Sequence, residues 1–451
     1  MLSGMWFLIV FAVLIVLMVV AISVLHIHPF LSMMATAFIL AFLCLDLDKI
    51  VDTITAGFAT AFATVGLLIF LGSLIGLILE RTGAAFKMGE FVVKIVGKKR
   101  PTTSIALMGW FTSMVIVSDS GFVVLNPVRK AIVMRIGVSS VAMTTALATS
   151  LAISHCMIPP AAAPLAAASI LGLENKLLWI IFFGVLVSIP ALIVTLLYAN
   201  FIGKRIKSET ELKVKETSVL KTYEELLASY GKLPNTFMSF LPILIPMALM
   251  GTSSICAMNH IEQPIVEFLG KPVIALTAGL FAALALLRSC KKKKTLYELT
   301  SNALNIAGSI LFITGAGCAL GKVVSESPLI PFLTNHHGLL DALGIFFPFI
   351  FAAILKTSQG SSTVAVMTTS NVVLPLLPQL GLDSPALMAL TVTAIGAGAM
   401  TVSHVNDSYF WIVSKLGGIQ KTEDVFKTLT ISTLLVGVTS ILTIFVISLF
   451  L

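Results

Sequence analysis

Runs of roughly 20 apolar residues recur along the chain and alternate with short polar segments, and a run of that length lets an α-helix cross the hydrocarbon core of a bilayer. Backbone in lipid must satisfy its own hydrogen bonds, so these runs predict helices. The alternating pattern of barrel strands is absent. The predicted spans are residues 5–24, 29–45, 53–79, 177–200, 237–257, 272–287, 303–323 and 426–450.

Two regions, 103–172 and 343–412, interrupt this pattern with Gly, Ser, Pro and ionisable residues. We interpret each as a re-entrant hairpin followed by a broken helix. An amphipathic stretch, Glu80 to Arg100, follows the third span, and Glu80 with Arg81 is interpreted as an interfacial pair. The long polar segment Lys204–Leu233 predicts a cytoplasmic linker. The predicted units are a first half at 1–202, a linker at 203–235 and a second half at 236–451.

The composition is typical of a polytopic membrane protein. Of the 451 residues, 57% are hydrophobic and 11% are charged, and the mean hydropathy is +1.04, whereas a soluble domain carries about 25% charged residues. The first apolar run has no basic segment before it and no evident cleavage site, so we interpret it as a retained helix and not as a signal peptide. The five cysteines show no metal-site or disulfide spacing, and no cofactor or metal is predicted.

The basic residues cluster at the ends of predicted spans. A net charge of +8 could indicate a nucleic-acid partner, but this distribution indicates membrane topology instead. With the N-terminus outside the cell, 24 of the 29 Lys and Arg residues fall on the cytoplasmic side, as the positive-inside rule predicts. The other five are Lys49, Lys176, Lys271, Lys322 and Lys356. We therefore expect this orientation and no binding to nucleic acid.

The same order of features occurs in both halves. Segments 66–83 and 309–327 match at an offset of 245 residues, which places Gly72 on Gly317 and Gly76 on Gly321. In each half a Ser/Gly-rich interruption follows, and then a Ser-His pair closes an Ala/Thr-rich helix. The halves start on opposite sides of the membrane, so they are predicted to be inverted repeats. Inverted repeats with interrupted helices indicate a secondary transporter with a midplane site, and chance likeness between apolar helices is the alternative.

Polar residues at membrane depth are costly and usually face a cavity. The segment Ser403–Ser408 is predicted to break a helix and to leave N–H groups at a half-helix start, which favours an anion. "SHCMIPP" is predicted to do the same in the first half, where Pro159 and Pro160 end the helix. "SDSG" and "SQGSST" are the predicted tips of two hairpins. These four elements are expected to enclose a small polar chamber.

These segments resemble one known family. "SHVND" followed by "FW", "GFVVLNP", "GSSTVA" and "ISHCMIPP" are similar to segments of the gluconate:proton symporter (gluconate permease) family, in order and over nearly the whole chain. The resemblance implies proton-driven uptake of sugar acids or of small hydroxy or amino acids. It also implies the ion transporter superfamily, an all-α fold with a scaffold domain and a mobile transport domain, and a homodimer in a bacterial cytoplasmic membrane.

Two positions depart from the family pattern. Gluconate members usually carry Glu where this chain has Asp119, and a His after the Pro pair where it has Ala161. Both departures weaken the expectation for gluconate itself and favour smaller acids, such as glycerate, D-serine or a hydroxybutyrate. The alternative is an enlarged site, because the loss of a bulky His would also leave more room.

The candidate site residues come from the same segments. Family members often place a basic residue at the start of the second hairpin, and Lys356 is there the expected partner of a carboxylate, or a lysine that reaches the interface. The predicted substrate-binding residues are Ser118, Asp119, Ser120, Asn126, His155, Lys356, Ser361, Ser362, Thr363, Ser403, His404 and Asn406. The predicted proton-coupling residues are Asp119, His155, His404 and Asp407, for which capping and structural hydrogen bonds are the alternative roles.

The leading hypothesis is a proton-coupled symporter for a small hydroxylated carboxylate, whose partners are that anion, protons and the bilayer. A sodium-coupled carrier is the alternative, because carbonyl groups exposed at a broken helix also bind sodium. A membrane enzyme or a channel is not favoured. The sequence holds no metal cluster, nucleotide-binding loop or nucleophile elbow, and an open pore needs no paired interruptions.

Overall fold

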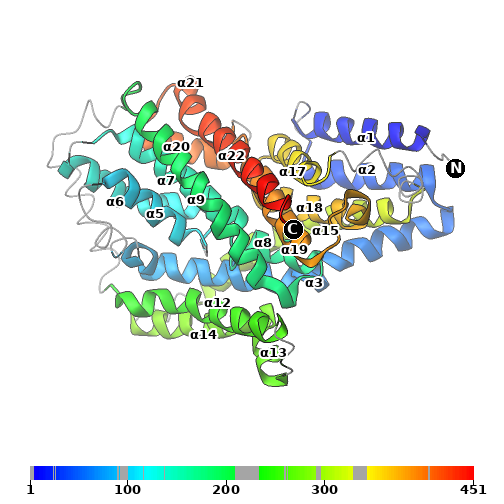
Figure 1. The fold of residues 1–451 in the computed structure, drawn as a ribbon, viewed down its shortest axis with the longest axis horizontal. Helices are drawn as coiled ribbons and strands as arrows, with labels where there is room; N and C mark the ends of the chain where they lie inside the picture. Colours follow the sequence, from blue (N-terminus) through cyan, green and yellow to red (C-terminus); the bar gives the residue numbers. More distant parts are fainter. Residues whose placement is uncertain are drawn as a thin grey trace.

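In the part of the chain that it describes, the computed structural model contains helices joined by turns and short extended segments, and no β-strand (Figure 1). The described residues are 5–23, 25, 27–88, 91, 100–114, 116–136, 138–208, 233–258, 261, 263–290, 296–328, 343–404 and 407–451. Seven helices among them are long and apolar enough to cross a membrane. The chain is therefore a multi-pass membrane protein. Residues 209–232 of the predicted linker and 92–99 of the predicted amphipathic stretch lie outside the described residues.

The helices of the first half agree with the predicted spans, but the third is longer than expected. It continues to Thr82 and stops at Gly83, whose φ of 74° ends the helix in the left-handed conformation. Glu80 and Arg81 therefore belong to this helix. The elements are α1 (Met5–Ser23), α2 (Pro29–Cys44), α3 (Leu47–Thr82), α5 (Pro101–Thr112), α6 (Ser118–Ile136), α7 (Ser140–Met157), α8 (Ala162–Ile170), η1 (Glu174–Lys176) and α9 (Leu177–Ile202).

The second half has a similar order of long helices, with an additional short helix, α13, between the first two of them. Its elements are α12 (Thr236–Met258), α13 (Pro264–Gly270), α14 (Pro272–Ser289), α15 (Leu296–Glu326), α17 (Phe346–Gln359), α18 (Ser362–Val373), η3 (Leu374–Leu376), η4 (Pro378–Leu380), α19 (Pro385–Met400), α20 (Ser408–Gly417), α21 (Thr422–Val425), the π-helical turn η5 (Phe426–Thr430) and α22 (Ile431–Ser448).

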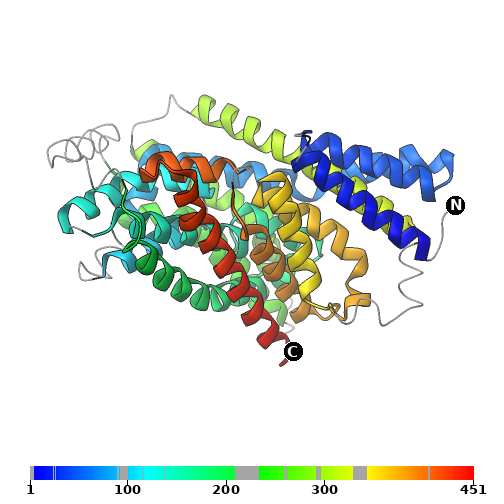
Figure 2. The same ribbon diagram turned by 90° about the horizontal axis from the view of Figure 1, so that it is seen from above.

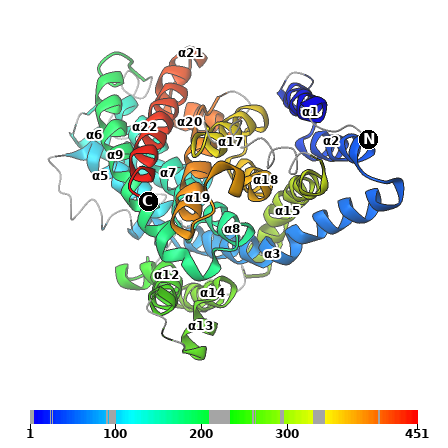
Figure 3. The same ribbon diagram turned by 45° about the vertical axis from the view of Figure 1, so that its right-hand side comes forward.

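The two longest helices, α3 and α15, pack along each other. Helix α2 packs on α15, and α14 packs on α3 (Figure 3). A further helix packs on each of these two, α1 on α2 and α12 on α14. The other helices, α5–α9 and α17–α22, form a second group. Figure 2 shows α1 and α2 at one end of the molecule, and α5 and α6 at the other.

The core of the second group is a crossing of α7 and α19. Every residue of α7 is buried, and so is every residue from Ala389 to Met400 in α19. Ala, Gly, Ser and Thr dominate both stretches, and small residues let helix backbones approach closely in a membrane. Gly396 marks the closest approach, because a Cβ there would lie 2.2 Å from the carbonyl oxygen of Cys156.

Both α7 and α19 end in extended segments at the predicted interruptions. Four residues, 158–161, separate α7 from α8 and include both prolines. The second interruption separates α19 from α20 and contains Val402, whose φ of 56° is unusual for a β-branched residue. Each broken helix is preceded by a helical hairpin, α5–α6 in the first half and α17–α18 in the second.

Candidate substrate-binding site

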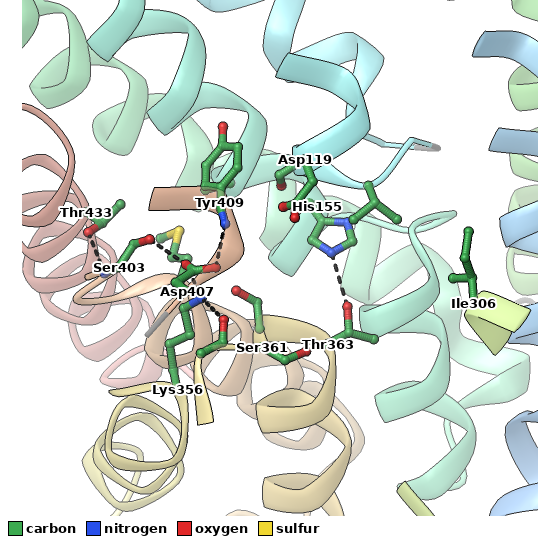
Figure 4. A pocket seen from close by; sticks show the side chains of 16 residues that line it. Asp119, His155, Ile306, Lys356, Ser361, Thr363, Ser403, Asp407, Tyr409 and Thr433 are labelled. Carbon is green, nitrogen blue, oxygen red and sulfur yellow. Dashed lines mark hydrogen bonds and ion pairs between the residues drawn. The ribbon is translucent and has the colours of Figure 1, made fainter. Parts of the chain in front are cut away.

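A cavity of about 320 Å³ lies where the second interruption, the α17–α18 hairpin tip and the start of α6 meet (Figure 4). Its volume is near the lower end of the range for small-molecule sites. The lining is Val117, Ser118, Asp119, Ala152, His155, Ile306, Lys356, Gly360, Ser361, Ser362, Thr363, Met400, Ser403, Asp407, Tyr409 and Thr433.

An ion pair forms one wall of the cavity. Lys356 Nζ lies 2.6 Å from Asp407 Oδ2 and donates to the Gly360 carbonyl oxygen at 2.7 Å. The Ser403 hydroxyl also donates to Asp407 Oδ2. Lys356 is 3% exposed and Asp407 is 4% exposed. Charges removed from water are tolerated when they are paired and hydrogen bonded, and both conditions are met here.

Helix starts surround the same space. Ser361 caps α18 by accepting from the Val364 N–H at 3.4 Å, and Asp407 caps α20 through Oδ1, which accepts from the Tyr409 N–H at 3.0 Å. Helix α6 begins at Ser118, which also lines the cavity. The first N–H groups of a helix have no partner within it and carry a partial positive charge, so converging helix starts favour an anion.

The opposite side of the cavity carries two titratable groups, Asp119 and His155 (Figure 4). His155 is in the last turn of α7, and its Nε2 lies 3.2 Å from Thr363 Oγ1 on α18. Hydrogen bonding to Thr363 joins the first half of the chain to the second across the cavity.

Most of the predicted substrate-binding residues line this cavity, but three of the described ones, Ser120, Asn126 and His404, do not. The side-chain oxygen of Asn126 accepts from Arg129 Nε at 2.9 Å, inside a buried network that reaches Ser140. Ser120 lines a smaller, adjoining cavity. His404 Nε2 lies 2.9 Å from the carbonyl oxygen of Thr357. Asn406 lies outside the described residues.

Tyr409 and Thr433 also line the cavity, and neither was predicted from the sequence. Tyr409 lines the cavity and donates from its hydroxyl to the Ala148 carbonyl oxygen at 2.8 Å. Thr433 lies on α22, one helical turn beyond the π-helical turn, and nothing in the apolar pattern there distinguishes it. A signal for Tyr409 existed, because it adjoins the polar segment that predicted the interruption.

Two threonines hold the second interruption in place. Thr433 Oγ1 accepts from the Ser403 N–H at 3.1 Å, and the Thr430 hydroxyl donates to the Ser403 carbonyl oxygen. Both backbone groups of Ser403 are thus satisfied by side chains from the end of the chain. A positive φ at a residue such as Val402 costs on the order of 1–3 kcal/mol and persists only where neighbours enforce it.

The described residues contain no group of three His, Cys, Asp or Glu side chains that could hold a metal ion. Within that part of the chain, the site instead combines one ammonium group, two carboxylates, an imidazole, several hydroxyls and helix starts. Such a set can bind a small hydroxylated anion reversibly.

Proteins similar in sequence to this chain are named as permeases and transporters. An uncharacterised permease of Haemophilus influenzae is 31% identical over 408 residues, which cover 87% of this chain and 82% of that protein. The low-affinity gluconate transporter of Escherichia coli K12 is 28% identical over 422 residues, 91% of each chain. The D-serine transporter of the same strain is 28% identical over 460 residues, 99% of each chain.

Solved structures agree on the fold. The Alcanivorax borkumensis YdaH transporter superposes with a TM-score of 0.67 at 15% identity, covering 94% of this chain and 99% of that one. A model of the GntP family of permeases matches residues 6–450, which confirms the resemblance found in the sequence. The protein is a membrane transporter, and the chain belongs to the GntP permease family.

Proposed function

We propose that the protein is a proton-coupled symporter that carries a small hydroxylated carboxylate into the cell across the bacterial cytoplasmic membrane. One observation carries the proposal: the buried ion pair of Lys356 and Asp407 lies on the wall of a cavity surrounded by helix starts. A pair in that position can exchange one carboxylate partner for another.

The substrate carboxylate is proposed to bind Lys356 and the start of α18. Asp407 and the Gly360 carbonyl oxygen occupy two of the three ammonium donors of Lys356. The hydroxyls of Ser361, Ser362 and Thr363 line the same wall and offer partners for substrate hydroxyls. Ser118 and Asp119 face them from the start of α6.

Coupling follows from competition for the lysine. Two carboxylates next to one ammonium group leave an excess negative charge in a medium of low dielectric constant, which is unfavourable. A proton on Asp407 removes that charge and allows the substrate to bind Lys356. Asp119, His155 and His404 remain further proposed proton sites, of which the first two line the cavity.

The membrane potential gives a second reason for a proton. A monocarboxylate that enters against an inside-negative potential costs about 2.3 kcal/mol per 100 mV, and one accompanying proton cancels this charge. Sodium would cancel it equally well, so a sodium-coupled carrier is the alternative.

The proposed substrate is a three- or four-carbon acid. Two of the relatives are named as transporters of gluconate and of D-serine, and these two substrates share a carboxylate and a hydroxyl group. A six-carbon acid needs partners for several hydroxyls, and each unmet partner costs about 1–3 kcal/mol. Asp119 is shorter than the Glu of gluconate members. Ala161 occupies the N-cap position of α8 and does not line the cavity. The missing His therefore affects the choice of substrate only through neighbouring residues.

Alternating access is proposed to use inverted repeats, 1–202 and 236–451, joined by the linker 203–235. Two equivalent contacts support this, because α14 packs on α3 as α2 packs on α15. The hairpins and broken helices that occur in both halves support it as well. Helices α1–α3 and α12–α15 would form the scaffold of a homodimer, and α5–α9 with α17–α22 the mobile transport domain.

Driven uptake in proteoliposomes tests the proposal. With the purified protein reconstituted, an imposed proton gradient should drive uptake of labelled glycerate or D-serine, and an imposed sodium gradient should not. Uptake that follows sodium and ignores the proton gradient would overturn the coupling. Competition against the label tests substrate size: displacement by gluconate at a ten-fold lower concentration than by glycerate or D-serine would overturn the size argument.

A further inference from the structure

A second, smaller cavity of about 40 Å³ adjoins the substrate cavity. The two share Val117, His155 and Ile306, and Figure 4 shows His155 and Ile306 on that edge. The remaining lining residues of the smaller cavity, called here the side chamber, are Gly72, Ser73, Gly76, Leu77, Glu80, Ile116, Ser120 and Ala162.

One face of α3 forms a wall of the side chamber. Residues 73, 76 and 80 follow one another at spacings of three and four, so they lie on the same face of the helix. Gly72 and Gly76 carry no side chain that would fill the space. The Ser120 hydroxyl on α6 hydrogen bonds to the Glu80 carboxylate. Glu80 therefore faces α6.

The side chamber is large enough for water. A cavity needs roughly 10–15 Å³ to hold one water molecule, together with two or more polar partners. Glu80, Ser73, Ser120 and His155 supply such partners. His155 lies between the two cavities, and its Nε2 is hydrogen bonded to Thr363 Oγ1. An imidazole can accept a proton on one ring nitrogen and release one from the other.

We propose that Glu80 is a proton-transfer group of the carrier, which receives protons from the substrate cavity through His155 and the side chamber and passes them to the side of the membrane where α3 ends. This inference rests on the proposed proton symport. In the proposed orientation α3 ends toward the cytoplasm, so Glu80 is the exit group. Each step breaks one O–H or N–H bond and forms another, with no other bond changed.

The charges around Glu80 give the transfer a direction. Glu80 and His155 are the titratable groups of the side chamber among the described residues, and Asp119, Lys356 and Asp407 face His155 from the substrate cavity. When the substrate leaves, Lys356 and protonated Asp407 together carry one positive charge. This charge opposes a proton on His155 and favours its transfer to the Glu80 carboxylate.

Proton movement and substrate movement can be measured separately in proteoliposomes that contain a pH-sensitive dye. Glu80→Gln keeps the size of the side chain and an acceptor for the Ser120 hydroxyl, but it cannot carry a proton. We expect substrate-driven acidification of the lumen to fall at least ten-fold, while substrate counterflow stays within two-fold of the wild type. Glu267→Gln, at an exposed position on α13, is the matched control and should change neither rate.

Each other outcome has a distinct meaning. Acidification by Glu80→Gln at the wild-type rate would overturn the role of Glu80 and leave proton symport intact. Equal loss of counterflow and acidification in Glu80→Gln would assign Glu80 to binding or folding. Glu80→Asp checks folding, because it keeps a carboxylate and should restore measurable acidification. Substrate entry without acidification by the wild type would overturn the symport itself, and this inference with it.

Discussion

At the scale of single residues, Asp407 combines two roles that use different atoms. Oδ1 caps α20 by accepting from the Tyr409 N–H, and Oδ2 pairs with Lys356 and accepts from Ser403. Asparagine caps helices about as well as aspartate but carries no charge and no exchangeable carboxyl proton. Substitution by asparagine can therefore separate capping from coupling.

Asp407→Asn should reduce net uptake much more than substrate exchange. Exchange can proceed without deprotonation of the carrier, whereas net uptake requires the proton to be released on each cycle. Removal of one partner from a buried pair costs about 3–5 kcal/mol, so the thermal midpoint in detergent should also fall. The measurement is uptake under a proton gradient beside counterflow, in the same proteoliposomes.

Asp383→Asn is the matched control, because Asp383 lies at an exposed position just before α19. This variant should retain both rates and the wild-type thermal midpoint. If Asp407→Asn gives near-normal rates in both assays, Asp407 acts only as a cap and carries no proton.

At the scale of elements, the two interruptions are held by different means. Prolines end α7, and its last carbonyl groups then lie against glycines of neighbouring helices. The second interruption depends on hydroxyls of Thr430 and Thr433 and on an unusual backbone angle at Val402. The first is therefore enforced mainly by its own sequence, and the second by contacts with α22.

Gly396→Ala should destabilise the crossing of α7 and α19. The added methyl carbon would lie 2.2 Å from the Cys156 carbonyl oxygen, and this backbone atom cannot move away without shifting α7. Overpacking of this kind costs typically about 1–3 kcal/mol. We expect a lower thermal midpoint in detergent and slower transport, because His155 lies beside Cys156.

Gly308→Ala provides the comparison, since a Cβ at that position of α15 meets nothing within 4 Å. Alanine should be neutral or stabilising there, by up to about 1 kcal/mol from helix propensity. Equal thermal midpoints for the two variants would contradict the close packing at Gly396.

At the scale of the whole molecule, the order of elements in the two halves restricts the orientation. If the halves are inverted, the loop between α8 and α9 and the helix α20 lie on opposite sides of the membrane. The basic residues favour the cytoplasm for α20 and the exterior for the loop.

Cysteine labelling tests this orientation. In a background without the five native cysteines, Asn175→Cys and Lys415→Cys place single thiols at exposed positions. A membrane-impermeant maleimide should label Asn175→Cys on intact cells, and Lys415→Cys only after permeabilisation. The reverse pattern would invert the proposed topology.

The sequence by itself determined the class of protein, the family, the approximate spans and the positions of both interruptions. These features depend on local physics: an apolar run must form a helix in lipid, and prolines or clustered polar residues must end one. The candidate residues at the hairpin tips, such as Lys356, could be predicted from the sequence for the same reason, because a basic residue in an apolar region requires a partner.

Only the tertiary structure decided which polar side chains share a cavity. Asn126 faces Arg129, His404 faces a carbonyl group, and Thr433 enters the site from the last helix. Asp407 finds its partner 51 positions away, at Lys356. The physical reason is that an interruption resets the rotation of the next helix. The face that a residue presents after it depends on packing between distant helices, which no local pattern encodes.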